Sequence, residues 1–299
     1  PCARPRPTAE EHYMIIRSSL PSTGVLEPPP LRTGVVRIAS IDVEWTKNYK
    51  IKNGQRPFCY SVAWLDLPDH RTPDLADVPF EWTSVYVEEP DEMEELIRNA
   101  TATVAVAAQT SRIITGHQFC SDLGVLEANA PADAVPRLQA ARTKWKGRRE
   151  AEPDESHYLD TRFDTGHLLT GKSRRLVDVC NELGLDVTQP ELLKVTMPAW
   201  HRRWVEDGQE EGRERVSVLN LRHSLSTAYV AAHAAGLAVW ADEGLNVNQA
   251  IAEGAKGAWG WLENPIFTDL LEDSCPSESA ALSPSKAPRP LARPRTSTR

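Results

Sequence analysis

The sequence predicts an α/β domain in which a mixed central sheet of about five strands is flanked by helices. Short apolar stretches with strand-like character fill the first part of the chain. From about residue 90 onward, two more such stretches alternate with longer helical patterns. The pair Asn53-Gly54 lies between the first two stretches, which indicates a hairpin and therefore an antiparallel portion of the sheet.

The first three strands are expected at residues 35–44, 58–67 and 82–87. The first is an apolar run that ends in Ser-Ile-Asp-Val-Glu. The second is rich in aromatic residues, and the third alternates apolar and polar side chains. Together they predict the antiparallel part of the sheet.

Helices and short strands are expected to alternate through the rest of the chain. Pro90 and the acidic residues after it favour a helix start, and this helix should run to about residue 108. Strands are expected at 112–116 and 158–160, with a helix at 121–130 between them. Three helices should follow at about 173–183, 191–207 and 210–235, with Gly184 and Gly236 as stops.

Composition divides the chain into three parts: a disordered segment 1–33, a folded domain 34–265 and a disordered basic tail 274–299. The first is rich in Pro, Arg, Ser and Thr, and the last in Ser, Pro, Ala and Arg. The net charge of −8 requires any nucleic-acid contact to come from a local basic patch. The absence of a long apolar run predicts no membrane partner, and scattered cysteines with no signal-peptide pattern predict a cytoplasmic protein with reduced thiols.

Asp42 and Glu44 are the first candidates for chemistry. Two positions apart on a strand, their carboxylates share one face and lie about 7 Å apart along the chain. Such a pair can bind a divalent cation, although a solvent-facing strand also produces it. Their place at the end of an apolar strand favours a site, because ligands gather there in open α/β sheets.

Two more acidic residues follow later strands. The run from Ile113 ends in Gly-His-Gln, and Asp122 comes five residues after His117, where a helix should start. Asp160 ends the strand at 158–160. Taken alone, Asp122 is explained equally well as a helix-start carboxylate, and a capping or turn role is favoured for Asp160.

In this order, the three motifs resemble those of the 3′–5′ exonuclease superfamily that has four acidic residues, the DEDD-type exonucleases of ribonuclease H-like fold. The resemblance spans about residues 35–236. Gln118 stands where the family usually has Asn, and Ser121 where it has Phe. His223 matches the histidine of the last motif, but alanine occupies position 228, where the fourth acid would lie. A buried structural role is the alternative for His223.

The resemblance implies a site and its cofactor. The catalytic residues would be Asp42, Glu44, Asp122 and His223, with His223 as general base. Asp42, Glu44 and Asp122 would bind two Mg²⁺ or Mn²⁺ ions, and Asp160 or Asp164 is a candidate to replace the missing acid. The residues that would contact nucleic acid are Thr46, His117, Gln118, Arg174 and Arg175.

The predicted function is metal-dependent 3′–5′ exonuclease activity on single-stranded DNA or RNA. The alternative is an exonuclease-fold module that binds nucleic acid but has lost efficient catalysis, which the alanine at position 228 favours. A small-molecule enzyme has no Gly-rich phosphate loop or Gly-x-Ser-x-Gly motif to support it. Basic and aromatic residues occur at 144–149, 172–175 and 201–204. They could line a channel for single-stranded nucleic acid or form the solvated faces of surface helices.

Overall fold

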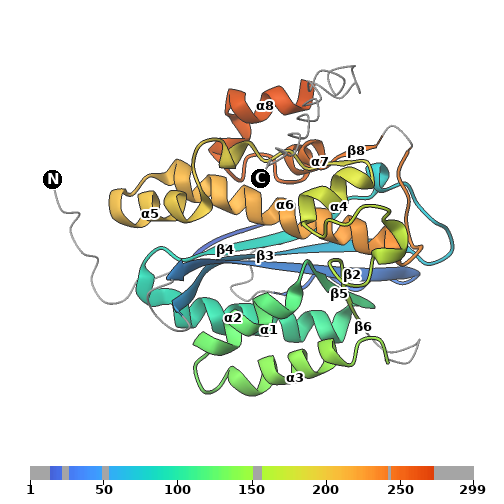
Figure 1. Ribbon diagram of the computed structural model, residues 1–299, viewed down its shortest axis with the longest axis horizontal. Helices are drawn as coiled ribbons and strands as arrows, with labels where there is room; N and C mark the ends of the chain where they lie inside the picture. Colours follow the sequence, from blue (N-terminus) through green and yellow to red (C-terminus); the bar gives the residue numbers. More distant parts are fainter. Residues whose placement is uncertain (1–13, 22–26, 49–53, 151–156, 242–243, 273–299) are drawn as a thin grey trace, which may run out of the picture.

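The fold is built on a six-stranded mixed sheet with helices on both faces (Figure 1). The computed structural model describes residues 14–21, 27–48, 54–150, 157–241 and 244–272. The strands, in the order β1-β4-β3-β2-β5-β6 across the sheet, are β1 (Ile15–Ser18), β4 (Phe80–Tyr86), β3 (Gly54–Pro68), β2 (Val35–Asn48), β5 (Ile113–Gly116) and β6 (His157–Asp160). A second sheet pairs β7 (Leu185–Asp186) with β8 (Leu245–Asn246).

The directions of the strands match the sequence prediction. β2, β3 and β4 pair antiparallel in succession, while β5 pairs parallel with β2, and β6 pairs parallel with β5. All five predicted strands are confirmed. The hairpin of β2 and β3 extends further than expected, and its Asn53 lies outside the described residues.

The N-terminal segment requires a correction, because residues within 1–33 are ordered. β1 pairs antiparallel with β4 and forms the edge of the sheet. The buried Arg37 guanidinium donates to the carbonyl oxygens of Pro29 at 2.6 Å and Pro30 at 2.9 Å. Backbone pairing and this arginine supply the order that composition alone did not predict. Residues 1–13, 22–26 and the basic tail 274–299 lie outside the described residues.

The helices cover both faces of the main sheet (Figure 1). α6 lies on one face, with α4, α5 and α7 packed against it, and α1 and α2 cover the other face, with α3 beyond them. The helices are α1 (Met93–Thr110), α2 (Phe119–Asn129), α3 (Val135–Lys146), α4 (Leu176–Glu182), α5 (Met197–Asp207), α6 (Glu210–Ala234), α7 (Val247–Gly254) and α8 (Pro265–Glu272). Sequence patterns predicted α1, α2, α4, α5 and α6; α3, α7 and α8 are additional. Within the described part of the chain, no helix combines the length and apolarity that crossing a bilayer requires.

The alternation of β2 sets the direction of the candidate carboxylates. Ile38 packs in the hydrophobic cluster that contains Leu221 and Leu225 of α6. Ala39, Ile41 and Val43 pack in the cluster that contains the buried residues of α1 and α2. Even-numbered positions of β2 therefore face α6, and Asp42 and Glu44 share that face.

Candidate functional site

The site lies where the parallel pairing of β2 with β5 ends. The last pair in this ladder is Ser40 with Thr115, and Asp42 and Glu44 follow on β2. Beyond that pair the backbone N–H of Val43 donates instead to the Asp122 carboxylate of α2, at 3.2 Å. A side chain thus satisfies a backbone group that the neighbouring strand leaves free.

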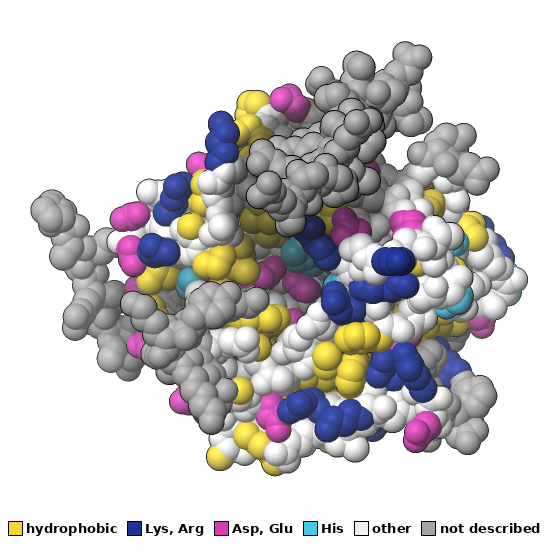
Figure 2. Space-filling model, in the orientation of Figure 1, with side chains coloured by type: hydrophobic (Ala, Val, Ile, Leu, Met, Phe, Trp, Pro, Cys, Tyr) yellow, Lys and Arg dark blue, Asp and Glu magenta, His cyan; other side chains and the backbone are white. Residues whose placement is uncertain are grey.

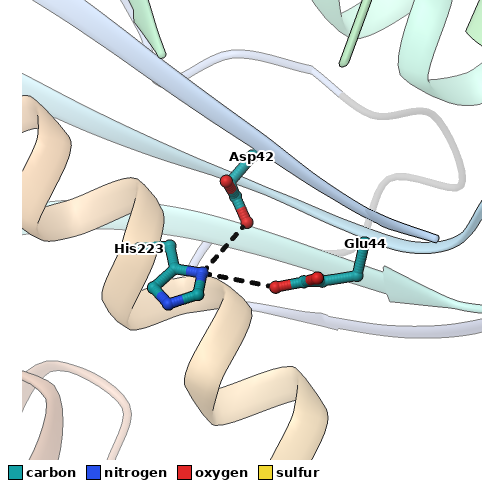
Figure 3. Close-up of side chains that lie close together, drawn as sticks. All are labelled: Asp42, Glu44 and His223. Carbon is teal, nitrogen blue, oxygen red and sulfur yellow. Dashed lines mark ion pairs between the residues drawn. The ribbon is translucent and has the colours of Figure 1, made fainter. Parts of the chain in front are cut away.

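Three side chains converge at this position (Figure 3). The Nδ1 atom of His223, on α6, lies 3.5 Å from Asp42 Oδ2 and 3.3 Å from Glu44 Oε1. One potential ligand atom from each of the three residues falls within 4.8 Å of the others. All three side chains are partly accessible, at 17% for Asp42, 11% for Glu44 and 22% for His223.

Two amide side chains complete the surroundings of this group. Asn220, three residues before His223 on α6, donates from Nδ2 to Asp42 Oδ2 at 2.6 Å and to the Asp42 carbonyl oxygen at 3.2 Å. Gln189 Nε2 lies 3.0 Å from His223 Nε2, on the far side of the imidazole. These contacts fix the Asp42 carboxylate and the His223 ring from outside the group.

The electrostatics of the site favour a positive charge between the carboxylates. Burial alone would lower the pKa of His223, but the Asp42 and Glu44 carboxylates raise it to about 10. Burial raises the pKa of Glu44, and the nearby Asp42 raises it further while His223 opposes the shift. The group therefore stabilises a cation at the point that His223 Nδ1 faces.

Asp122 stands beside the group and does not join it. Its side chain is buried, and its Oδ1 atom accepts the hydrogen bond from Val43. Burial raises its pKa well above the ordinary value, and the Asp42 charge adds to the shift. The structure thus brings three of the four predicted catalytic residues into contact and places the fourth against the same strand.

Asp160 has a structural role, and the structure does not bring it to the group. Its carboxylate accepts hydrogen bonds from the backbone N–H groups of Gln118 and Phe119, both at 2.9 Å. It also accepts from the N–H of Arg162 at 3.1 Å and from Trp145 Nε1 at 3.0 Å. Asp160 thereby joins the end of β6 to the start of α2. The neighbouring Asp164 is engaged by Arg148 and Arg149.

The residues predicted to contact nucleic acid lie around the ends of β2 and β5. Thr46 is partly exposed on β2. His117 contacts Thr161 Oγ1 at 3.0 Å and the Arg174 carbonyl at 2.9 Å, and burial lowers its pKa to about 4. Gln118 has a left-handed backbone (φ 62°) as the residue before α2.

Arg174 and Arg175 differ in how available their guanidinium groups are. The Arg174 side chain donates to the carbonyl oxygens of Gly171 and Ser173. Arg175 is 79% exposed and only loosely paired with Asp178, at 3.9 Å. Arg175 is therefore the more accessible of the two.

Within the stretch 201–204, His201 and Trp204 pack toward the interior, whereas Arg202 is exposed. Trp204 is buried, and His201 stacks on Phe58 with ring centroids 3.8 Å apart. His201 Nδ1 also lies 2.9 Å from the Tyr86 hydroxyl. For His201 and Trp204 the interpretation as a nucleic-acid surface is corrected, because the His201 ring packs against Phe58 of β3 and Tyr86 of β4, and Trp204 Nε1 donates to the Val87 carbonyl oxygen at 3.3 Å.

Position 228 does not define what faces the carboxylates. α6 is one continuous helix from Glu210, and a spacing of five residues places Ala228 about 140° around it from His223. Ala228 is fully buried in the hydrophobic cluster with Leu225. Besides His223, the α6 residue that contacts Asp42 is Asn220, so a fourth acid on this helix would reach Asp42 from position 220 and not from 228.

Sequence reasoning missed Asn220 and Gln189. Asn220 had a visible signal, because it is a lone amide within the run Val218-Leu219-Asn220-Leu221 of a helix that is apolar on several sides. Gln189 precedes α5 in an irregular segment, and its contact with His223 comes from tertiary structure alone. No local pattern indicates it.

The donor set fits a divalent cation. Asp42 and Glu44 offer carboxylate oxygens, the ligands that Mg²⁺ and Mn²⁺ prefer, and His223 offers a nitrogen on the same side. Among the described residues this is the one group of three or more potential ligands close enough to bind a single ion. No family model and no curated protein matches the chain.

Proposed function

We propose that the protein is a metal-dependent 3′–5′ exonuclease of ribonuclease H-like fold that acts on single-stranded DNA or RNA. The observation that carries the proposal is the convergence of Asp42, Glu44 and His223 beside Asp122. An antiparallel β2-β3-β4 unit extended by the parallel strands β5 and β6 is compatible with that fold. Asp42, Glu44, Asp122 and His223, which the motifs singled out far apart in sequence, lie close together where the parallel pairing of β2 with β5 ends.

Asp42 and Glu44 would hold the cation, with His223 facing the same point. Bound Mg²⁺ or Mn²⁺ ions activate water and stabilise the leaving oxygen in phosphodiester cleavage, commonly as a pair. Asn220 orients the Asp42 carboxylate through the 2.6 Å hydrogen bond. His223 Nδ1 is the nitrogen available to bind the cation or exchange a proton, because Nε2 is turned toward Gln189.

Asn220 favours a second candidate, a nucleic-acid-binding module with weakened catalysis. Its amide contacts Asp42 where a carboxylate would add a negative charge and a further metal ligand. Asp122 is engaged by a backbone N–H, which leaves two carboxylates in the group of three. A site with this charge binds divalent cations less tightly than one with four acids.

The two candidates can be separated with a 5′-labelled single-stranded oligonucleotide and either Mg²⁺ or Mn²⁺. Wild type and Asp42→Asn would be compared with Glu94→Gln, a control on α1, whose carboxylate is 63% exposed on the opposite face of the sheet. The exonuclease proposal predicts a ladder that shortens from the 3′ end, is abolished in Asp42→Asn and is unchanged in Glu94→Gln.

Binding of the same oligonucleotide gives the second measurement. Retained binding with no ladder under either metal would support the binding module and contradict the exonuclease. A ladder that survives Asp42→Asn would show that the cleavage does not arise at this site. If the wild type neither binds nor cleaves the oligonucleotide, both candidates are contradicted.

A further inference from the structure

An exposed aromatic side chain lies in the loop that follows β6. Phe163 is 44% exposed, although it is a large apolar residue. Its ring packs edge-on against Trp145 of α3, with centroids 6.2 Å apart, and the Arg162 guanidinium lies 5.9 Å from its centroid. Protein groups therefore contact only part of the ring, and the exposed part remains accessible to a planar ligand.

The loop that carries Phe163 is held rigidly. Asp164 accepts a bidentate pair of hydrogen bonds from Arg148, at 2.6 and 3.0 Å, and one from the backbone N–H of Asp160 at 2.9 Å. Arg148 also lies 4.2 Å from the centroid of Trp145. A ring fixed in this way loses little conformational freedom when a ligand stacks on it.

Arginine side chains lie beside this ring, and one of them, Arg149, is also paired with Asp164 at 2.9 Å. Arg149 is 67% exposed and donates to the Phe163 carbonyl oxygen, and Arg162 donates to the Arg174 carbonyl. Arg175 is 79% exposed. Figure 2 shows Lys and Arg side chains gathered around hydrophobic ones over the region of β6 and α4, in a chain whose net charge is −8.

Phe163, Arg149, Arg162 and Arg175 form a basic aromatic surface, which is connected through His117 to the region of the candidate metal site. His117 contacts Thr161 through one ring nitrogen and the Arg174 carbonyl through the other. The His117 imidazole therefore joins the loop after β6 to the segment before α4. His117 itself follows β5, the strand that pairs with β2, on which Asp42 lies.

We propose that a single strand of nucleic acid binds with one unpaired base stacked on Phe163 and with flanking phosphates on Arg149, Arg162 and Arg175. A single strand fits because its bases expose their faces, whereas a duplex buries them. The inference deepens the proposed function by naming where the strand lies. It requires the strand to pass the candidate metal site but does not require cleavage.

The test measures binding of fluorescein-labelled oligo-dT and oligo-rU, of 12 nucleotides each, by anisotropy in EDTA. Phe163→Ala should weaken binding about 5- to 150-fold, the range expected for losing one base stack. Phe163→Trp should restore it, and Ile266→Ala, a change at a residue of α8 that is equally exposed at 44%, should leave it unchanged. The plot of log affinity against log salt concentration has a negative slope. Arg175→Ala should reduce the magnitude of that slope by about 0.7, the effect of one lost phosphate contact.

The outcomes separate this inference from the proposed activity. If Phe163→Ala weakens binding and no cleavage occurs with either metal, the surface stands and the exonuclease proposal fails. If wild type cleaves but Phe163→Ala binds like Ile266→Ala, the surface proposal is wrong while the activity stands. Equal affinity for a duplex of the same sequence, or no effect of Phe163→Trp relative to Phe163→Ala, would also overturn it.

Discussion

Replacing Asn220 with Asp tests the charge balance of the site directly. The substitution keeps the size of the side chain but exchanges a donor 2.6 Å from Asp42 Oδ2 for an anionic oxygen. Two carboxylates with charge centres about 4 Å apart repel by roughly 4 kcal/mol at an effective dielectric constant of about 20. Protonating one carboxyl at pH 7 instead costs about 4 kcal/mol, because its ordinary pKa is about 3 units lower.

We therefore expect Asn220→Asp to lose about 4 kcal/mol of stability in EDTA. For a domain of this size that corresponds to a fall in Tm of roughly 8–16 °C. A divalent cation between the carboxylates removes the repulsion, so Mn²⁺ should recover most of the loss. By linkage, the affinity for Mn²⁺ should rise at least about tenfold.

The assay is thermal unfolding in EDTA and in a Mn²⁺ titration, with Mn²⁺ affinity checked by calorimetry. Asn181→Asp, at an exposed position of α4, is the matched control and should change neither Tm nor Mn²⁺ binding. The reasoning is refuted if Asn220→Asp has wild-type stability in EDTA. It is also refuted if Mn²⁺ stabilises the variant no more than it stabilises the wild type.

Two further predictions concern buried groups outside the metal site. Glu191 and Arg222 form a fully buried ion pair at 2.6 Å, so Glu191→Gln should cost about 3–5 kcal/mol in denaturant unfolding. The exposed pair of Glu94 with Arg98 should cost less than about 1 kcal/mol when Glu94 becomes Gln, and equal losses would contradict the argument. Burial lowers the pKa of His201 to about 4, below the ordinary 6.5 of an unfolded chain, so acidification from pH 7 to 5 protonates the unfolded state and destabilises the fold. His201→Gln should reduce that loss by up to about 2 kcal/mol, and an unchanged pH dependence would show that His201 is not its source.

The sheet was predictable because its signals are local. Strand periodicity and the hairpin turn depend on neighbouring residues, and all five predicted strands formed. β1 was not predictable from its surroundings, since Pro-rich sequence on both sides outweighs the short run Met14-Ile15-Ile16. Its order comes from pairing with β4, a partner more than sixty residues away in the chain.

The site was predictable where strand geometry determines it. Period-two alternation placed Asp42 and Glu44 on one face, and the structure confirms that shared face. Asp160 shows where sequence stops being informative, because a carboxylate after a strand can bind a metal or accept backbone hydrogen bonds. The four donors around it in the structure favour the second role.

The difference between Asn220 and Ala228 changes how the missing acid should be understood. Counting five residues from His223 assumes that the chain between the two positions returns to the same side, which a continuous α-helix does not do. On α6 the residue three positions before His223 faces Asp42, and the alanine is buried in the core. The alanine is therefore no argument against catalysis. The alternative, a binding module with weakened catalysis, rests instead on the amide of Asn220, which keeps the hydrogen bond to Asp42 but contributes no charge.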